Sequence, residues 1–262
     1  MGTHFAGIAG GPGSRARDNA GVSEVAATPI PRRGRLWVIL ALALALGALG
    51  YALVSISTKK ADTDFVQIEG ISTAQELFGG VPQEGDRLGS SDAPVAIQVF
   101  NDLQCGDCRA DFLATIPGLV EKYARPGSVK LLMRHYSVAE NPLELGFFGA
   151  EAAAEQGYGW QYTYLFFLNQ AEAERFGIDN DFMASLAGSI GELDVPEWQE
   201  ALDREGGSGG AMAKRLEADG ELGTKLGIRT GVAMILSGPS GTRTLQDGPS
   251  AAQAERAIEA VS

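Results

Sequence analysis

The chain has 262 residues, 45% of them hydrophobic, which is enough for a sizeable domain with its own core. Its formal net charge is −12, which argues against a nucleic-acid partner, because phosphate binding needs a basic face. Residues 1–60 hold 7 Lys and Arg against 2 Asp and Glu, a net of +5, whereas residues 61–262 hold 14 against 31, a net of −17. We therefore expect the two parts to lie in different surroundings.

A long uncharged stretch lies near the end of the basic part. Residues 36–56 read LWVILALALALGALGYALVSI and contain no charged side chain. A helix of this length spans about 30 Å, which is the thickness of the hydrocarbon core of a bilayer. We predict a single transmembrane helix that is retained as an anchor. A cleaved signal peptide, which usually has a shorter apolar core, and a buried core helix are the alternatives.

The charges around this stretch predict its orientation. Five arginines precede it and two lysines follow it, which favours a cytoplasmic N-terminus. Residues 1–35, rich in Gly, Ala, Pro and Arg, then form a disordered cytoplasmic tail. We expect the protein to lie in the cell membrane and to contact lipid through the anchor. Everything from about Ala61 is then extracytoplasmic, where disulfides persist.

The outer region begins with a segment of mixed character. Residues 57–88 are polar, acidic and interrupted by Gly and Pro, so we expect a linker or lead-in. Residues 95–102, VAIQVFND, alternate in polarity and predict a strand. A helix is expected from the cysteines to Tyr123, kinked at Pro117 because proline removes a backbone donor. A second strand is expected at 128–137.

A helical region follows the second strand. Residues 141–223 predict several helices separated by Gly and Asn-Asp breaks. We expect them at 143–156, 160–170, 180–190, 196–205 and, as a short helix, 211–218. Two strands around a Gly/Pro turn are predicted at 232–246. A closing helix is predicted at 250–261, with Ser250 and Gln253 in capping-box spacing.

Both cysteines of the chain lie in FNDLQCGDCR, at the predicted strand-to-helix turn. A thiolate is the attacking species in thiol–disulfide exchange, so a reactive cysteine needs a lowered pKa and solvent access. Cys105 at a helix N-terminus meets both needs, because free N–H groups and the helix dipole stabilise negative sulfur. Cys108, about one turn later, is placed to resolve a mixed disulfide. Gly106 lets a substrate chain approach closely.

Four stretches of the chain carry a resemblance to a known family. They are SDAPVAIQVFNDLQCGDC, LLMRHYSV, AAEQGYGWQYTYLFFLNQ and GIRTGVAMIL. Together they resemble the DsbA-like branch of the thioredoxin superfamily, over roughly residues 89–261. The resemblance implies an α/β, thioredoxin-like fold for residues 89–262, of order β-α-β, helical insertion (about 141–223), β-β-α. The predicted transmembrane helix precedes it.

This resemblance also implies a function. The protein is expected to be a membrane-anchored, extracytoplasmic thiol–disulfide oxidoreductase, with Cys105 as the nucleophile and Cys108 as the resolving residue. Its partners are cysteine-containing secreted or membrane proteins and a membrane or small-thiol redox partner. It needs no bound cofactor. Proteins of this family usually place a cis-proline opposite the cysteines, and Gly231 and Val232 stand at the matching positions here. The missing proline motivates an alternative: a thioredoxin-fold binding or chaperone-like module with weak or no catalysis.

Asp107 lies between the two cysteines, and its charge opposes a thiolate at Cys105. At roughly 6 Å and an effective dielectric of about 20–80, one charge is worth about 0.7–2.8 kcal/mol. We therefore predict a couple less strongly oxidising than that of DsbA and nearer to thioredoxin-type values. Gly106, Asp107 and the anchor also fit a dedicated reductase for cytochrome maturation or copper delivery. The sequence leaves the direction of the reaction open.

Other interpretations of the cysteines and of their surroundings are weaker. A structural disulfide at this spacing closes a tiny loop and restricts the unfolded chain little. A zinc site needs about four ligands, and of the two histidines His4 would lie across the membrane from His135. We expect no metal, although a soft-metal site needs fewer ligands. His135 is expected to be a structural hydrogen-bonding residue rather than a proton shuttle. The aromatic residues of 158–167 are expected to form mostly helical core, and a peptide groove lined by part of them is the alternative.

Overall fold

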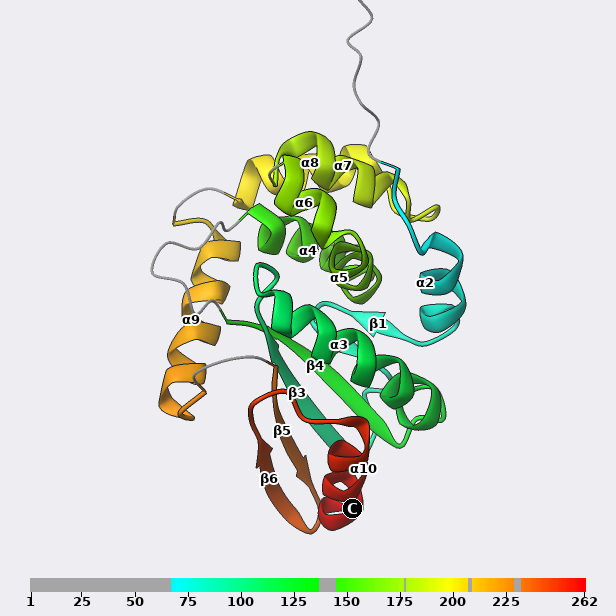
Figure 1. Ribbon diagram of the computed structural model, residues 1–262, viewed down its shortest axis with the longest axis vertical. Coiled ribbons are helices and arrows are strands. Elements are labelled where there is room, and N and C mark those ends of the chain that lie inside the picture. Colours follow the sequence, from blue (N-terminus) through cyan, green and yellow to red (C-terminus); the bar gives the residue numbers. More distant parts are fainter. Residues whose placement is uncertain (1–66, 137–144, 177, 207–208, 229–231) are drawn as a thin grey trace, which may run out of the picture. The chain divides into compact units, whose positions relative to one another are not determined.

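The computed structural model describes residues 67–136, 145–176, 178–206, 209–228 and 232–262, without the side chains of 145 and 174–176 (Figure 1). These residues belong to one unit of the chain, residues 62–262. The predicted tail and the predicted transmembrane helix at 36–56 lie outside them. Among the helices that are described, none combines the length and the apolar character needed to cross a membrane.

A six-stranded mixed sheet forms the centre of the unit (Figure 1). Its strands lie in the order β1-β2-β4-β3-β5-β6. β3 and β4 are parallel, and every other neighbouring pair is antiparallel. The bounds are β1 Gln83–Glu84, β2 Arg87–Leu88, β3 Val95–Asn101, β4 Val129–His135, β5 Ala233–Gly238 and β6 Gly241–Leu245.

The two central strands determine where the cysteines lie. β3 is mostly buried along its length, as expected for a strand with neighbours on both sides and helices on both faces. β4 alternates buried and half-buried residues. In the parallel register Val95 pairs with Val129 and Asn101 with His135, so both strands end at the same edge of the sheet. The CGDC segment leaves the sheet from this edge.

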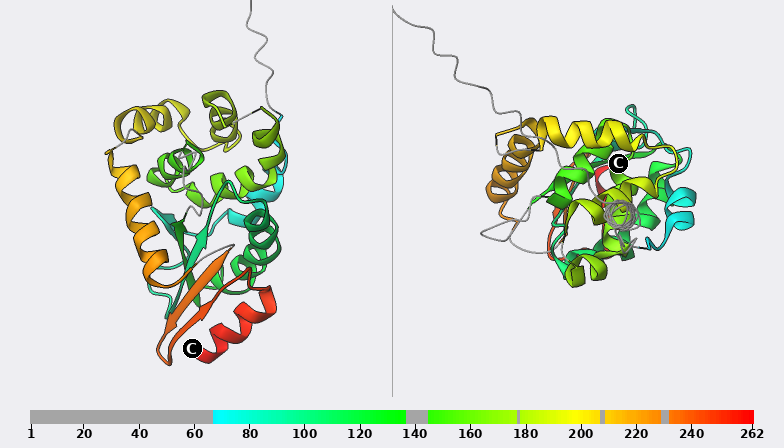
Figure 2. Two further views of the ribbon diagram at one scale, coloured as in Figure 1. Left: turned by 60° about the vertical axis from the view of Figure 1, so that its left-hand side comes forward. Right: turned by 90° about the horizontal axis from the view of Figure 1, so that it is seen from above.

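Helices cover both faces of the sheet (Figure 2). α3 (Gly106–Leu119) and α10 (Ala251–Val261) pack on one face, and α9 (Ala211–Lys225) packs on the other. The larger apolar core lies on the α3 side, whereas a smaller cluster around Phe100 and Ile235 lies under α9. The capping box of Ser250 and Gln253 is present at the start of α10 and confirms that prediction.

The expected helical region is confirmed, with changes in detail. The helices are α4 Leu145–Glu155, α5 Gly159–Leu168, α6 Gln170–Phe176, α7 Asn180–Gly188, α8 Val195–Glu205 and α9. The helix expected at 160–170 ends earlier, and a separate helix begins at Gln170. α5 is buried along nearly its whole length, including Trp160, Tyr162 and Phe167. Its aromatic residues therefore form helical core, as predicted.

The segment expected to be a linker or lead-in is partly built into the fold. α2 (Ile71–Phe78), β1 and β2 all lie within residues 67–88, and β2 pairs with β4. Phe78 and Leu88 are almost fully buried. The acidic composition did not reveal this, because the few apolar side chains of the segment are the ones that reach the core.

The irregularity expected at Pro117 takes the form of a change of helix type. α3 continues through Pro117 to Leu119 and passes directly into η1, a π-helical turn at Val120–Ala124. The N–H of Arg125 reaches the carbonyl of Val120 at 2.9 Å. A proline cannot donate to the preceding turn, and a π-type turn is a known way to absorb such a disturbance within a helix.

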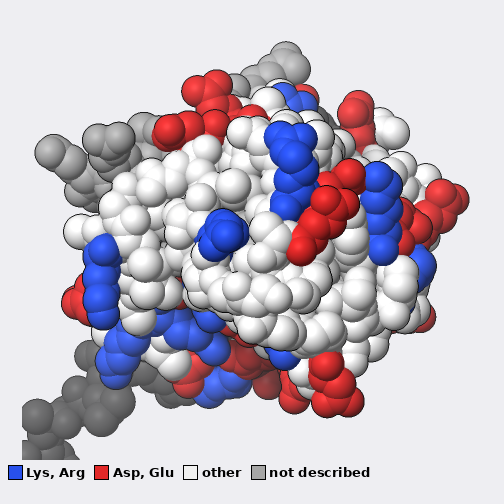
Figure 3. Space-filling view, turned by 90° about the horizontal axis from the view of Figure 1, so that it is seen from below, with Lys and Arg blue, Asp and Glu red and all other residues white. Residues whose placement is uncertain are grey.

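Figure 3 shows the end of the unit that carries α10 and the β5–β6 hairpin. The middle of this face holds few charged side chains, and acidic and basic residues lie side by side around it. Lys122 and Glu255 form an ion pair of 2.5 Å that joins η1 to α10. The acidic excess of the outer region is therefore not concentrated on this face.

Candidate active site

The two cysteines begin α3, as the sequence predicts. Cys105 is the N-cap residue, and its Sγ accepts a hydrogen bond from the backbone N–H of Cys108 at 3.0 Å. The two residues are joined by a disulfide, with their Cα atoms 5.1 Å apart. Cys108 is fully buried, whereas Cys105 is half-buried. One sulfur is thus open to a partner, and the other lies behind it.

The turn between β3 and α3 is ordered by its own aspartate. Asp102 is buried, and its Oδ1 accepts a hydrogen bond from the N–H of Gln104 at 2.9 Å. Its backbone carbonyl accepts the N–H of Cys105 at 3.1 Å. An aspartate that bonds to the backbone two residues ahead is a common way to stabilise a tight turn. This turn delivers Cys105 to the N-terminus of α3.

The residues between the cysteines face outward. Gly106 and Asp107 are exposed. There is room for a side chain at Gly106, because no atom of the described residues would lie within 4 Å of its β-carbon. Asp107 is the acidic residue of the first helical turn. One turn later on α3, burial and the charge of Asp107 together raise the pKa of Asp111. The first two turns of α3 therefore carry two neighbouring carboxyl groups.

Val232, the residue expected at the proline position, is described, whereas Gly231 before it lies outside the described residues. Val232 is fully buried just before β5. Its carbonyl accepts the N–H of Gly248 at 3.0 Å. A side chain on Gly248 would overlap the carboxyl group of Asp111. Val232, Gly248 and Asp111 therefore connect the start of β5 to the outer side of α3.

Two contacts between the helical insertion and the residues beside the CGDC segment (Cys105–Cys108) were not predicted. Arg109 Nε donates to the carbonyl of Phe167 at 2.7 Å, and Gln170 Nε2 donates to the carbonyl of Leu103 at 3.0 Å. A signal for them exists in the sequence. Asn169 and Gln170 are polar residues directly after the apolar run YLFFL, and buried polar side chains need hydrogen-bond partners.

Comparison with known proteins identifies the family. The family described as thioredoxin matches residues 83–219, about half of the chain. The chain belongs to this family. A probable disulfide bond formation protein D of Bacillus cereus is 22% identical over 202 residues, which cover 76% of this chain and 84% of that protein. A protein of the same name from Bacillus anthracis is 20% identical over the same shares of the two chains.

Solved structures share the fold of this thioredoxin-family protein. BdbD from Bacillus subtilis, in its oxidised form, matches with a TM-score of 0.56 and 19% identity, covering 68% of this chain and 95% of that one. The α-DsbA1 protein of Wolbachia pipientis matches with a TM-score of 0.54 and 15% identity, covering 67% and 89%. The DsbA-like fold expected from the sequence is therefore confirmed. The names of the two Bacillus relatives describe disulfide bond formation. Together with the family, they show that the chain is a thiol–disulfide oxidoreductase.

His135 ends β4 and is buried. Its ring packs edge-on against Phe147 of α4, with centroids 4.7 Å apart. Burial, helped by the charge of Arg134, lowers the pKa of His135 to about 3. Its backbone N–H donates to Asp219 of α9 at 3.0 Å. A histidine held neutral inside the core fits the expected structural role better than that of a proton shuttle.

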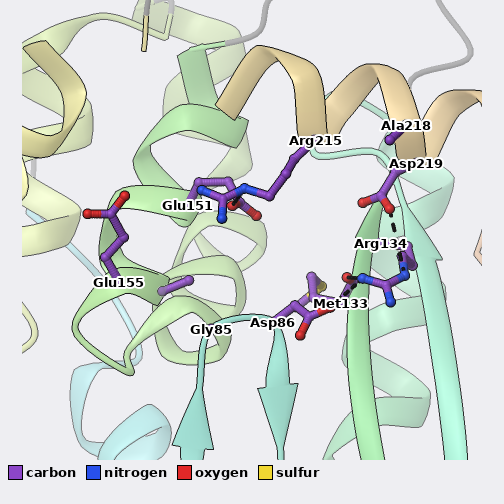
Figure 4. A pocket seen from close by; sticks show the side chains of 10 residues that line it. Gly85, Asp86, Met133, Arg134, Glu151, Glu155, Arg215, Ala218 and Asp219 are labelled. Carbon is purple, nitrogen blue, oxygen red and sulfur yellow. Dashed lines mark hydrogen bonds and ion pairs between the residues drawn. The ribbon is translucent and has the colours of Figure 1, made fainter. Parts of the chain in front are cut away.

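A charged cavity of about 350 Å³ lies between α4, α9, β4 and the β1–β2 turn (Figure 4). Glu151 of α4 pairs with Arg215 of α9 at 2.7 Å, and Arg134 of β4 pairs with Asp86 and Asp219. Burial raises the pKa of Glu151 to about 7 and that of Asp219 to about 6, although the arginines oppose the change. Between the helical insertion and the sheet, three carboxyl groups thus pair with two guanidinium groups, those of Arg134 and Arg215. Among the described residues, no group of three or more His, Cys, Asp and Glu has an arrangement that suits a metal ion.

Proposed function

We propose that this oxidoreductase is anchored in the membrane and exchanges disulfides with the cysteines of secreted proteins outside the cytoplasm, through Cys105 and Cys108. The observation that carries the proposal is the unequal placement of the two sulfurs. Cys105 caps α3 and is half-buried, while Cys108 is fully buried behind it. A partner protein can therefore reach only Cys105, and Cys108 can react only with its neighbour.

In the oxidising direction the exchange takes two steps. A substrate thiolate attacks the Sγ of Cys105, forms a mixed disulfide and expels Cys108 as a thiolate. A second substrate thiolate then attacks the substrate sulfur of the mixed disulfide and expels Cys105. The substrate loses two electrons and two protons and gains a disulfide, while the protein gains two thiols. A membrane or small-thiol partner must then reoxidise the pair, and the reverse sequence of steps reduces a substrate.

The proposed location rests on the sequence. The uncharged residues 36–56, the arginines before them and the opposite net charges of the two parts support an anchor with a cytoplasmic N-terminus. The oxidising direction is supported by the name of the Bacillus relatives, which describes disulfide bond formation. Cysteines of exported proteins are the substrates that such a location makes available.

Two observations favour second candidates. Asp107 is exposed at the first turn of α3, and its charge disfavours a thiolate at Cys105, which supports a dedicated reductase for cytochrome maturation or copper delivery. Val232 at the usual proline position supports a binding module with weak catalysis. In that case, substrate binding would survive replacement of both cysteines.

The deciding experiment is the reduction potential of the intact protein, measured by equilibration with glutathione and thiol labelling. A reversible couple near about −120 mV marks a strong oxidant, and one near about −270 mV marks a reductant. Cys108→Ser should trap mixed disulfides in cells, because the resolving sulfur is missing, while Cys105→Ser serves as the matched control and should trap none. If the cysteine pair never cycles between disulfide and thiols, the binding module becomes the better explanation and this proposal is wrong.

A further inference from the structure

The junction between α5 and α6, residues 167–170, contacts the chain on both sides of the CGDC segment (Cys105–Cys108). Gln170 holds the carbonyl of Leu103, two residues before Cys105, at 3.0 Å. The carbonyl of Phe167 accepts the Nε of Arg109, the residue after Cys108, at 2.7 Å. The junction therefore brackets the redox pair, although it is about 60 residues away in the sequence.

We propose that Gln170 is a positioning residue for Cys105: through the Leu103 carbonyl, the helical insertion fixes the turn that delivers Cys105 to the N-terminus of α3. The inference rests on the proposed function, because it takes Cys105 as the attacking thiol. Gln170 does not touch the sulfur. It acts through the backbone of the turn that Asp102 and Gln104 order from within.

The contact between Gln170 and Leu103 is enclosed. Gln170 and Leu103 are only 3% and 5% exposed, so water does not readily replace a lost partner. A buried carbonyl that loses its donor in such a place becomes unfavourable, and the turn must shift to satisfy it. Leu103 also lies close to Gly146 of α4, so the turn is held between two helices of the insertion.

The junction is itself fixed by the chain that enters the domain. The side chain of Asn169 accepts the N–H of Glu69 at 2.8 Å and donates to the carbonyl of Glu69 at 3.1 Å. Its Nδ2 also donates to the carbonyl of Leu165 at 2.8 Å. The space above Gly70 is filled by the side chain of Leu168. Gln170 thus acts from a rigid support.

The effect of Gln170 should differ between the two redox states. In the oxidised protein the covalent bond between the sulfurs holds Cys105 in place. In the reduced protein that bond is absent, and Cys105 depends on the turn to keep its Sγ near the N–H of Cys108 and the start of α3. Loss of the Gln170 contact should therefore weaken thiolate stabilisation in the reduced form. The couple should become less oxidising, because the reduced form loses stability.

The test compares two buried glutamines of the insertion in the full-length protein. Gln170→Leu removes the donor at nearly constant volume, and Gln170→Met is a second variant with more freedom to fit. Gln161→Leu on α5 is the matched control, because Gln161 is also buried and has an Oε1 without a hydrogen-bond partner among the described residues. The described residues show no hydrogen bond from Gln161 to the CGDC segment. The measurements are the pH dependence of Cys105 alkylation in the reduced protein and the glutathione equilibrium constant.

Both Gln170 variants should alkylate about twofold to tenfold more slowly below the pKa of the thiol, with a similar change in the equilibrium constant toward the disulfide, as expected for one lost hydrogen bond. Gln161→Leu should leave both values unchanged even if it alters the melting temperature. The inference is overturned if the wild type cycles and the Gln170 variants match it, or if Gln161→Leu shifts both values equally. A wild type that does not cycle would instead overturn the proposed function, and this inference with it.

Discussion

The backbone N–H of Cys108 points at the Sγ of Cys105, 3.0 Å away, at the first turn of α3. Cys105 has the geometry of an N-cap residue, with an extended backbone at φ −93° and ψ 116°. Serine and aspartate oxygens commonly accept such bonds at helix starts. Here a sulfur accepts the bond instead. Because hydrogen bonds to a charged acceptor are stronger than those to a neutral one, this bond is strongest when the sulfur is a thiolate.

The first prediction concerns the order in which the two thiols react. In the reduced protein, iodoacetamide should modify Cys105 at least about tenfold faster than Cys108, because Cys105 gains thiolate character at the helix start and Cys108 is fully buried. Mass spectrometry of peptides from briefly treated protein gives the two rates. Equal rates would mean that the first turn of α3 opens when the disulfide is reduced. Cys105→Ser should leave the remaining thiol almost unreactive.

The second prediction concerns Asp107. Asp107→Asn removes one negative charge beside Cys105, so the reduced form becomes more stable and the couple more oxidising. At roughly 6 Å the expected rise in reduction potential is about 15–60 mV, and it should shrink in high salt. Equilibration with glutathione at two salt concentrations measures it.

The matched control for Asp107 is Asp181→Asn. Asp181 occupies the first turn of α7, a helix without cysteines, and is also exposed. Its replacement should leave the reduction potential unchanged. An unchanged potential in Asp107→Asn would show that this charge does not weaken the oxidant, and the expectation of a thioredoxin-like value would lose its basis.

Local patterns predicted most elements of the fold, and tertiary contacts explain where they failed. β3, β4 and α10 begin and end close to the expected residues because their apolar periodicity is strong. α9 was expected to stop at 218 but continues to Lys225. Gly223 lies in the unexpected part of this helix, and a side chain there would overlap the ring of Tyr136. This glycine permits close packing on the sheet, which no local pattern can reveal.

The candidate site was predictable only in part, for the same reason. The cysteines and their strand-to-helix turn follow from residues next to each other in the sequence. Gln170 and Leu103 are 67 residues apart, so their hydrogen bond becomes visible only in the fold. Val232 was placed by family resemblance, and the structure adds its bond to Gly248.

The third prediction concerns His135. Its pKa is about 3 in the folded protein against an ordinary value of 6.5, so the folded state binds fewer protons than the unfolded state between these values. The free energy of unfolding should therefore fall as the pH drops from 6.5 toward 3. His135→Gln should lose less stability than the wild type over this range, as measured by denaturant titration. Its pH–rate profile for disulfide exchange should match the wild type, and an altered profile would identify a proton shuttle instead.

The fourth prediction concerns Glu151 in the charged cavity, for which the stability changes with pH in the opposite direction. Its pKa is about 7 in the folded protein against an ordinary value of 4.5, so the folded state binds more protons than the unfolded state between these values. Stability from this group is complete below pH 4.5 and is lost as the pH rises through 7. The wild type should lose about 3 kcal/mol over this window through Glu151, because one pKa unit corresponds to about 1.4 kcal/mol.

Glu151→Gln should remove this part of the pH dependence, because a neutral amide fits the buried site at every pH and still accepts a hydrogen bond from Arg215. The variant should be more stable than the wild type above about pH 7 and similar to it below about pH 5. Some decline should remain, because burial also raises the pKa of Asp219 across the cavity. Glu155→Gln, one turn further along α4 and paired with Arg204, is the control and should keep most of the slope, because the charge of Glu155 is only the smallest of the causes that raise the pKa of Glu151. If Glu151→Gln keeps that slope as well, Arg215 at 2.7 Å holds Glu151 ionised despite its burial, and the pH dependence must come from Asp219.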